Sequence, residues 1–406
     1  MLEQWPARLQ LYPRDQTNQC TVTISGRVAA NEVRSVSLIV FKDKLPVQYI
    51  RQRTDSLTGR FAVKPAIQAE RSEYGFQLFT HSTNRGQLPT DSVLVAFRDS
   101  IVCGDVYLVM GQSNALGGLG PTLYRNEFCR TFGVNNGDAA YNPADTAWCL
   151  TNTIEGANCL WSVELQRLIN EQNGMPTAIL NGAVGSTSID RHLKRGGDQS
   201  TALGTIYGRL LYRARKAGVA DQVKAMIWRQ GESDAVSKPD QYAQLFPQLY
   251  AAWKQDYVGL KKVYHAQINL LVDNVINAGA LRDYQRQSKT TFGDNEPIAT
   301  VGLSGYQGVH YSESGYRQFG QELYRLVARD FYGSTDTSNI QSPNIQRLFF
   351  STPQQDEITL EFEPGQVMRW PADTIIVNPA SGTRYAQRLS QFIYTDYPNG
   401  QSGFIK

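Results

Sequence analysis

The chain has 406 residues, of which 41% are hydrophobic and 19% are charged, and its formal net charge is +3. This length predicts two or three domains, and the composition excludes a disordered chain. No apolar run approaches the ~20 residues that a membrane span needs, and no block of consecutive lysines or arginines marks a nucleic-acid surface. We therefore expect neither a membrane span nor a nucleic-acid partner.

Residues 1–98 are predicted to form a β-sandwich of the immunoglobulin or fibronectin type. Short alternating or β-branched runs recur here between turn signals, for example at residues 20–25, 36–41 and 74–80. No residue pattern in this region points to chemistry. The sequence favours a packing or spacer role over sugar binding.

From residue 99 to residue 333, strands alternate with helix-length segments, which predicts an α/β domain with a doubly wound parallel sheet. Buried strands are expected at residues 106–110, 177–180, 224–228 and 266–272. Helices are expected at residues 161–172, 207–216, 240–257 and 314–332. Sites in such sheets form at the carboxyl ends of strands, and Ser113, Gly185 and Gln230 each follow a predicted strand.

Residues 334–406 are predicted to form a small β-rich appendage. Residues 333–339 have the composition of a linker, and residues 357–362 alternate as in a strand. The first six residues lack a basic leader followed by an apolar core, so we expect no signal peptide in this sequence.

Ser113 follows the buried run at residues 106–110 across Gly111 and Gln112. A strand-to-helix turn presents a serine at the edge of a sheet, where free backbone N–H groups can stabilise an oxyanion. This is the geometry of a nucleophile elbow, although the G-x-S-x-G pattern is absent. The alternative is a serine that only caps a helix, and these few residues alone favour the cap.

Four segments, in order, resemble the conserved blocks of the SGNH (GDSL-like) hydrolases. Residues 105–114 carry the G-Q-S-N of the branch with sialate O-acetylesterases and plant-type carbohydrate acetylesterases. Residues 181–189 resemble the second block, residues 228–234 the third in its W-x-Q-G-E form, and residues 308–320 the last, G-V-H-(F/Y)-S. The match covers roughly 230 residues, a usual size for one α/β domain. It implies a flavodoxin-like SGNH domain and a serine esterase that removes acetyl groups from carbohydrates.

The resemblance implies a role for each site residue. Ser113 is the expected nucleophile and His310 the expected base, since histidine has a pKa suited to proton transfer near neutrality. The backbone N–H groups of Ser113 and Gly185 and the amide of Gln230 are the expected oxyanion donors. Three residues before the histidine, where the family has an aspartate, this chain has Gln307, whose amide carries no negative charge.

Three outcomes are open for the missing acid. Another carboxylate, Glu232 first and Asp234 second, orients His310. Alternatively, the enzyme works as a Ser–His dyad with a carbonyl oxygen as orienter. In the third outcome the protein is a carbohydrate-binding protein with a degenerate esterase pocket. We rank a replaced or dispensed-with acid above loss of activity, because the other three blocks are intact.

Other candidates for substrate binding or orientation are Gln112, Asn114 and His192. For His192 a solvated loop position is modestly favoured over a place in the pocket, and His265, near a predicted strand, is expected to be structural. The chemistry requires no metal or organic cofactor. The expected partner is an acetylated saccharide: an acetylated sialic acid, an acetylated xylan or another decorated polysaccharide.

The five cysteines form no C-x-x-C or Cys/His cluster that would indicate zinc. Buried free thiols and one or two disulfides near the loop after Ser113 are equally weighted. By analogy with the family, the β modules favour a periplasmic or secreted protein.

Overall fold

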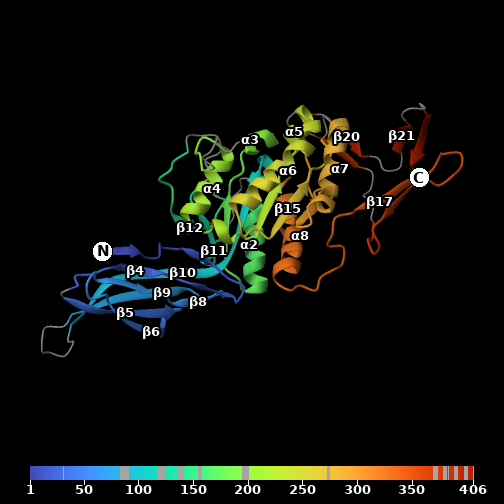
Figure 1. Ribbon diagram of the computed structural model, residues 1–406. Helices are drawn as coiled ribbons and strands as arrows, with labels where there is room; N and C mark the ends of the chain where they lie inside the picture. The colour runs from blue at the N-terminus through green and yellow to red at the C-terminus, as the bar shows by residue number, and fades with distance from the viewer. Residues whose placement is uncertain are drawn as a thin grey trace.

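A computed structural model gives the structure of the chain. An N-terminal sandwich is followed by a central α/β domain and then by C-terminal hairpins, coloured from blue through green to red in Figure 1. The structure describes the chain except for residues 31, 83–90, 118–123, 135–140, 154–157, 194–200, 272–274, 369–373, 378–381, 383, 388–391, 397–400 and 406.

The N-terminal strands form packed antiparallel sheets, as expected. One sheet has the order β1-β4-β7, made of β1 (Leu2–Gln4), β4 (Ile24–Arg27) and β7 (Arg60–Val63). The larger sheet has the order β6-β5-β9-β10, made of β6 (Leu45–Arg53), β5 (Val33–Lys42), β9 (Tyr74–Ser82) and β10 (Asp91–Gly111). A short pair consists of β3 (Gln19–Thr21) and β8 (Ala66–Gln68). Alternate residues turn into a common core that includes Ile24, Val36, Leu38, Phe76 and Leu78.

Strand β10 belongs to both N-terminal and central domains. Its first half pairs with β9 of the sandwich, and β2 (Leu11–Pro13) runs parallel to it at Val102–Gly104. Its second half lies between β13 (Thr177–Asn181) and β14 (Ala225–Arg229), parallel to both. The boundary expected between residues 98 and 99 therefore falls inside a continuous strand.

The central domain confirms the doubly wound α/β fold. Its sheet has the order β12-β11-β13-β10-β14-β15-β16, with β12 antiparallel to β11 and the other neighbours parallel. The added strands are β11 (Cys129–Phe132), β12 (Trp148–Leu150), β15 (Lys262–Gln267) and β16 (Asn295–Ala299). The order β13-β10-β14-β15-β16 is that of a flavodoxin-like sheet, in which the connections leave in opposite directions on either side of β10. A site is expected at the carboxyl end of that strand.

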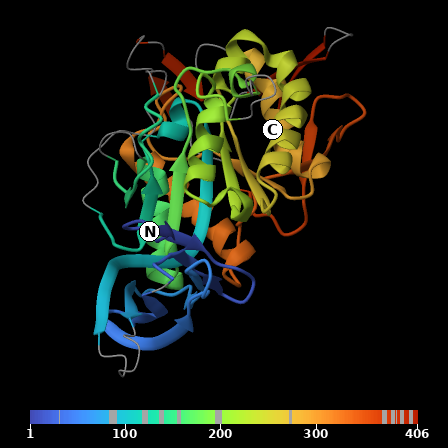
Figure 2. The same cartoon turned by 60° about the vertical axis from the view of Figure 1, so that its left-hand side comes forward.

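Helices cover both faces of this sheet (Figures 1 and 2). Core residues of α2 (Leu160–Asn173) and α8 (Glu313–Phe331) pack with one set of sheet residues. Core residues of α4 (Ile206–Lys216), α6 (Pro239–Asp256) and α7 (Val275–Thr291) pack with the opposite set. The short elements are α1 (Ser113–Leu116), α3 (Ile189–Leu193), the 3-10 turn η2 (Ala220–Gln222) and α5 (Glu232–Ser237). Among the described residues, no helix combines the length and apolar character needed to cross a membrane.

Two parts of this domain differ from the sequence expectation. The strand expected at residues 266–272 is β15 and ends at Gln267, because the next N–H, of Ile268, donates to the side chain of Gln285 and so leaves the sheet. The pair α7 and β16 was not expected. The α7 sequence is rich in polar residues, and β16 contains Pro297, which is tolerated because β16 ends the sheet.

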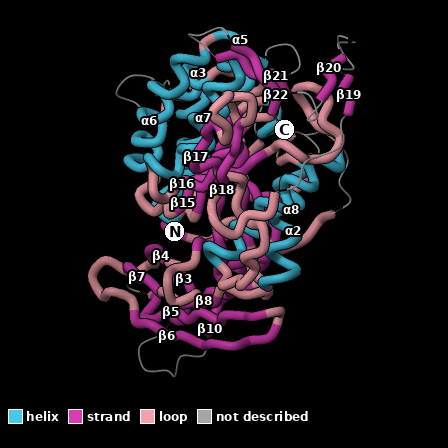
Figure 3. The backbone as a smooth tube through the Cα atoms, turned by 90° about the vertical axis from the view of Figure 1, so that its right-hand side faces the viewer, coloured by secondary structure: helices cyan, strands magenta, loops and turns pink. Residues whose placement is uncertain are grey.

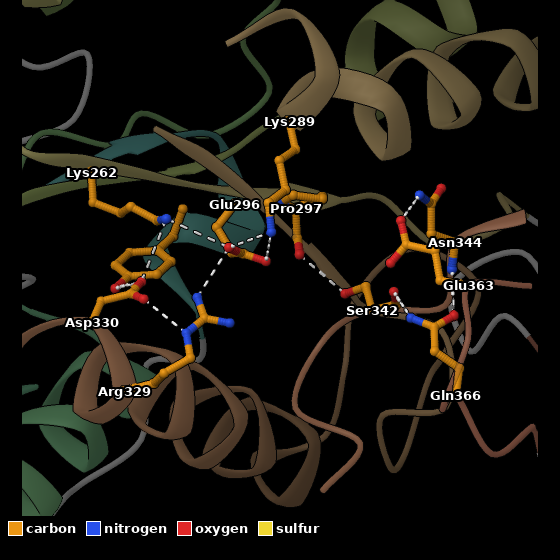
Figure 4. A network of polar contacts seen from close by, with 11 residues as sticks. Lys262, Lys289, Glu296, Pro297, Arg329, Asp330, Ser342, Asn344, Glu363 and Gln366 are labelled. Atoms are coloured by element: carbon orange, nitrogen blue, oxygen red, sulfur yellow. Dashed lines mark hydrogen bonds and ion pairs between the residues drawn. The ribbon is translucent and has the colours of Figure 1, made fainter. Parts of the chain in front are cut away.

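The C-terminal segment is fastened to this outer strand. Oγ of Ser342 accepts the N–H of Ala299 at 2.7 Å. It also donates to the carbonyl oxygen of Pro297 at 3.1 Å (Figure 4). Nearby, the buried carboxylate of Glu296 forms ion pairs with three cations, Lys262, Lys289 and Arg329. Three hairpins follow, β17 (Ile345–Phe350) with β18 (Ile358–Phe362), β19 (Thr374–Val377) with β20 (Arg384–Gln387), and β21 (Phe392–Asp396) with β22 (Gln401–Ile405). The predicted β-rich appendage is thus a series of hairpins.

The five cysteines are thiols in the structure, which is the first of the two alternatives weighed from the sequence. Four of them, Cys20, Cys103, Cys129 and Cys159, are buried.

Candidate active site

The turn after β10 places Ser113 at the carboxyl end of the central strand. Gly111 has a φ of +142°, and a Cβ atom there would lie 2.0 Å from the carbonyl oxygen of Arg229, so this close approach requires glycine. The N–H of Gln112 donates to the same carbonyl oxygen at 3.1 Å. Helix α1 begins at Ser113 itself. The serine therefore leaves the sheet on a fixed turn, in the manner of a nucleophile elbow.

His310 lies on the loop between β16 and α8, and its ring reaches the serine. Its Nε2 atom is 2.8 Å from Oγ of Ser113. The loop is held as a tight turn, because the N–H of Gln307 donates to the carbonyl oxygen of His310 at 2.8 Å and Tyr306 pairs with Tyr311 as a β-bridge. The structure thus joins two residues that are 197 positions apart in the sequence. At this distance histidine can take the proton of the serine hydroxyl.

Ser113 and His310 line one cavity of about 470 Å³, within the range of ~300–1,000 Å³ typical of small-molecule sites. Its wall combines serine hydroxyl groups with an apolar patch and one carboxylate. The other lining residues are Gln112, Ser186, Ser188, Glu232, Ser233, Val236, Ser237, Leu271 and Val309. In the described part of the chain, no group of three or more His, Cys, Asp or Glu side chains is arranged to hold a metal ion.

Two backbone N–H groups beside this cavity are available to a ligand. Neither the N–H of Ser113 nor that of Gly185 donates to an acceptor within the described residues. Gly185 is partly exposed, and the nearest contact of an added Cβ would be Leu116 at 3.8 Å, so its surroundings are open. Both groups match the requirement for oxyanion donors, which must not be satisfied elsewhere.

The third expected donor is placed differently. Gln230 is fully buried, and its Nε2 atom donates to Oε1 of Gln112 at 3.1 Å and to the carbonyl oxygen of Thr187 at 2.9 Å, and also contacts Asp234. An amide nitrogen has only two protons, so these acceptors account for both. Gln230 therefore lies behind the cavity wall and ties the Gln112 side chain to the loop after β13.

Comparison with known proteins agrees with the fold and shows the family. A model of the family described as carbohydrate esterase, sialic acid-specific acetylesterase, matches residues 103–329, more than half of the chain. The chain belongs to this carbohydrate esterase family. It is therefore a carboxylic ester hydrolase with SGNH architecture, as the sequence blocks predicted. A search of curated protein sequences finds no match.

Several solved structures are similar to this chain. A carbohydrate acetylesterase from Xanthomonas citri has 16% identity and a TM-score of 0.60, and the match covers 95% of this chain and 90% of that one. A protein from Arabidopsis thaliana has 16% identity and a TM-score of 0.46, covering 56% of this chain and 99% of that one. A family two carbohydrate esterase from Clostridium thermocellum, in complex with cellohexaose, has 11% identity and a TM-score of 0.34, covering 78% and 96%. The first match shows that the esterase shares its overall fold, sandwich included, with a distant relative.

In the esterase, the buried side chain of Asn114 links the segments that carry Ser113 and His310. It is buried, and its Nδ2 atom donates to Oε1 of Glu232 at 2.6 Å and to the carbonyl oxygen of Val309 at 2.9 Å. The hydroxyl of Tyr316 donates to Oδ1 of Asn114 at 2.9 Å. All the hydrogen-bonding atoms of the Asn114 side chain are thus engaged by protein. Asn114 connects the turn that carries Ser113 to the histidine loop and does not line the cavity.

The residues considered as the acid do not touch the histidine. Within the described residues, His310 has no carboxylate at ion-pair distance, and Glu232 reaches its loop only through Asn114. Gln307 is exposed, and its side chain has no hydrogen-bond partner in the described part of the chain. The backbone of residues 307–310, rather than the Gln307 amide, holds the histidine.

Asp234 and His192 lie in the layer behind the cavity. Oδ2 of Asp234 accepts the N–H of Ile189 at 3.0 Å, and burial raises the pKa of this carboxyl group to about 6. His192 is 0% exposed, so the expected solvated position was wrong. Its Nε2 lies 2.8 Å from Oγ1 of Thr187, and burial lowers its pKa to about 3, which keeps the ring neutral.

His265 is structural, as expected. It is fully buried, and its Nε2 lies 2.9 Å from the hydroxyl of Tyr242.

One residue near the site was not expected from the sequence. The guanidinium group of Arg229 is buried, and its centre lies 5.2, 5.4 and 4.1 Å from the ring centroids of Tyr311, Tyr316 and Phe319. Its Nη1 and Nη2 atoms have no hydrogen-bond acceptor in the described part of the chain. The aromatic rings belong to the histidine loop and to α8, so no local pattern around residue 229 could have indicated the contact.

Proposed function

We propose that this carbohydrate esterase is a serine esterase that removes O-acetyl groups from saccharides through an acyl-enzyme intermediate. The observation that carries the proposal is the 2.8 Å contact between Oγ of Ser113 and Nε2 of His310 on the cavity wall. Nucleophile and base at hydrogen-bond distance, with free backbone donors beside them, form the minimal apparatus of acyl transfer.

The proposed reaction has two halves. His310 takes the proton of Ser113 as Oγ attacks the acetyl carbonyl carbon, and the N–H groups of Ser113 and Gly185 donate to the resulting oxyanion. His310 then returns the proton to the sugar oxygen, the C–O bond breaks, and acetyl-Ser113 remains. In the second half His310 deprotonates a water molecule, which attacks the acetyl carbonyl carbon. The bond between this carbon and Oγ of Ser113 then breaks, His310 gives the proton to Oγ, and acetate leaves.

We propose the dyad form of this mechanism. No carboxylate of the described residues lies at ion-pair distance from His310, and the loop is held by its own turn and by Asn114. Glu232, the first candidate for a relocated acid, acts in this proposal through Asn114, whose N–H it accepts. The oxyanion role expected for the Gln230 amide would require one of its internal hydrogen bonds to be exchanged.

The cavity wall is suited to an acetylated sugar. Serine hydroxyl groups at Ser186, Ser188, Ser233 and Ser237 can exchange hydrogen bonds with sugar hydroxyl groups. The apolar patch of Val236, Leu271 and Val309 offers a place for the acetyl methyl group. The candidate substrates remain acetylated sialic acid and acetylated polysaccharides. By analogy with the family, we propose a periplasmic or secreted location.

The test is acetate release from 4-nitrophenyl acetate, from acetylated xylan and from O-acetylated sialic acid. Ser113→Ala should reduce kcat by about 10³-fold or more on every substrate that the wild type cleaves, since residual catalysis without the nucleophile is small. Ser56→Ala, on an exposed turn of the sandwich, is the matched control and should leave the rates unchanged. Undiminished hydrolysis by Ser113→Ala would refute the serine mechanism.

The second candidate is a carbohydrate-binding protein with a degenerate pocket, and Gln307 in place of the family's aspartate favours it. If this candidate is correct, the wild-type protein will bind an acetylated saccharide and release no acetate.

A further inference from the structure

A second cavity lies in the N-terminal sandwich, on the outer face of its larger sheet. The volume is about 790 Å³. We call it the sandwich hollow and define it by its lining residues, Phe41, Asp43, Lys44, Glu73, Tyr74, Gly75, Gln77, Phe97, Asp99 and Ser100. Figure 3 shows the strands of this sheet at the end of the molecule opposite α5.

Strand register determines the shape of the hollow. Phe41 of β5 lies opposite Gly75 of β9, and Phe97 of β10 lies opposite Gln77 of β9. These four residues share the outer face, whereas the alternate residue Phe76 is buried in the core. Since neighbouring strands are ~4.8 Å apart, the two phenylalanines stand on strands about 10 Å apart, with β9 between them. Gly75 adds no side chain to the floor.

The hollow combines aromatic rings with hydrogen-bonding groups. Phe97 is 50% exposed, so a large apolar ring faces solvent there without a protein partner covering it. Around it stand the carboxylates of Asp43, Glu73 and Asp99 and the amide of Gln77. Aromatic rings stack on apolar faces, while carboxylates and amides accept hydroxyl protons. A pyranose ring presents both features, an apolar C–H face and a rim of hydroxyl groups.

The charges of the rim favour a neutral ligand. Glu73 is neutralised by Arg130 of the central domain, whose Nη2 lies 3.1 Å from Oε1 of Glu73. Asp43 and Asp99 remain, against one ammonium group, Lys44. An anionic polysaccharide would meet net repulsion here.

We propose that the sandwich hollow binds a neutral polysaccharide chain and anchors the esterase to its substrate. The proposal reverses the spacer role expected from the sequence, and it rests on the proposed function in taking the substrate to be a saccharide. Phe97 lies in the first half of β10 and Ser113 just beyond its end, at most ~50 Å apart along the chain. A ligand in the hollow therefore leaves the catalytic cavity free. Only a long chain gains from both sites, by an increase in effective concentration.

The test is affinity electrophoresis of the full chain in gels containing unsubstituted xylan, soluble β-glucan or polygalacturonate. We expect retention by at least one neutral polymer, no retention by polygalacturonate, and at least about tenfold weaker binding by Phe97→Ala, because the stacking surface is lost. Phe349→Ala is the matched control, since Phe349 is an exposed phenylalanine of the C-terminal strand β17, outside the hollow. Both variants should hydrolyse 4-nitrophenyl acetate at the wild-type rate. For acetylated xylan, Phe97→Ala should have a higher KM than the wild type.

Four results would overturn the proposal. They are no retention by any neutral polymer, equal retention of Phe97→Ala and wild type, stronger binding to polygalacturonate, and retention that disappears in Ser113→Ala. A change of oligomeric state in Phe97→Ala, seen by size-exclusion chromatography, would assign the hollow to a second copy of the chain instead. Equal melting temperatures of Phe97→Ala and wild type exclude misfolding as the cause of lost binding. Unchanged hydrolysis by Ser113→Ala would refute the proposed mechanism and leave the retention result standing.

Discussion

The side-chain nitrogen of Asn114 lies 2.9 Å from the carbonyl oxygen of Val309, so the residue after Ser113 holds the residue before His310. This bond joins two segments that are 195 residues apart. The bond is partly buried, because Asn114 is buried and Val309 is half-buried. Its loss leaves a carbonyl group without its donor, at a cost of up to about 1–3 kcal/mol. The geometry of Ser113 and His310 therefore depends on a side chain that does not touch the substrate.

Asn114→Ala should reduce kcat by about 10- to 100-fold, because a bond of ~1–3 kcal/mol no longer fixes the histidine loop. KM for a small acetate ester should change little, since Asn114 does not line the cavity. Steady-state kinetics with 4-nitrophenyl acetate separates the two effects. A rise in KM with unchanged kcat would instead place Asn114 in substrate binding.

Two substitutions of Glu232 distinguish the role of its negative charge from the role of its hydrogen bond to Asn114. Glu232→Gln retains an oxygen that accepts the Asn114 N–H, whereas Glu232→Ala does not. In the dyad mechanism kcat of Glu232→Gln should stay within about threefold of the wild-type value. The kcat of Glu232→Ala should fall by about as much as that of Asn114→Ala. If the charge itself oriented His310, kcat of Glu232→Gln would drop by about 10⁴-fold, as when the aspartate of a triad becomes an amide.

Gln307 gives the complementary test. Its side chain is exposed and makes no hydrogen bond within the described residues, so Gln307→Ala should leave kcat unchanged. Gln307→Asp introduces a carboxylate in the position that the family uses, and stabilisation of the imidazolium should raise kcat by up to about tenfold. Rates of acetate release from pH 5 to 9 measure both variants. A tenfold fall of kcat in Gln307→Ala would show that the Gln307 amide orients the imidazole ring of His310 in the wild type.

The resemblance of four ordered blocks to the SGNH hydrolases predicted roles for Ser113 and His310. The placement of these blocks at strand ends and before a helix predicted that the two residues meet, because parallel strands bring such positions to one edge. Ser113 and His310 therefore meet at the carboxyl end of β10. The sequence did not predict how they are held. Asn114, Glu232 and Val309 come from three distant segments, and their contacts follow from packing rather than from local propensity. The same reason explains the missed β16, whose short polar strand forms only against β15 and the Ser342 side chain.

The buried carboxyl group of Asp234 predicts a pH dependence of stability. Burial raises its pKa in the folded protein to about 6, above the ~3.9 of an unfolded chain. The folded state therefore holds its proton more tightly, and this contribution is complete below pH 4 and is lost as the pH rises through 6. Two pKa units correspond to about 3 kcal/mol.

Urea unfolding of wild type and Asp234→Asn at pH 4 and pH 7.5 measures this contribution. Asparagine cannot ionise, so groups common to both proteins cancel in the difference. From pH 4 to pH 7.5, the free energy of unfolding of the wild type should fall by about 2–3 kcal/mol relative to that of the variant. A pH-independent difference would show that Asp234 is ionised at both.

Arg229 provides the last test, because it separates stability from activity. Its buried guanidinium has three aromatic rings around it and no acceptor for Nη1 or Nη2 in the described part of the chain. Two of the rings are connected to the site: Tyr311 is the residue after His310, and the hydroxyl of Tyr316 donates to Asn114. Each desolvated cation–π contact contributes ~2 kcal/mol, but burial of the charge costs several kcal/mol, so the two effects largely offset each other.

Arg229→Met fills a similar volume without the charge. We expect its free energy of unfolding to stay within about 1 kcal/mol of the wild type, because the cost of burying the charge disappears together with the contacts it made. We expect kcat to fall by about tenfold, since Tyr311 and Tyr316 lose the group that fixes them behind the dyad. Arg229→Lys, which keeps the charge, should recover part of the rate. Urea unfolding and hydrolysis of 4-nitrophenyl acetate measure the two quantities, and a destabilised Arg229→Met with unchanged kcat would make Arg229 a residue of the core alone.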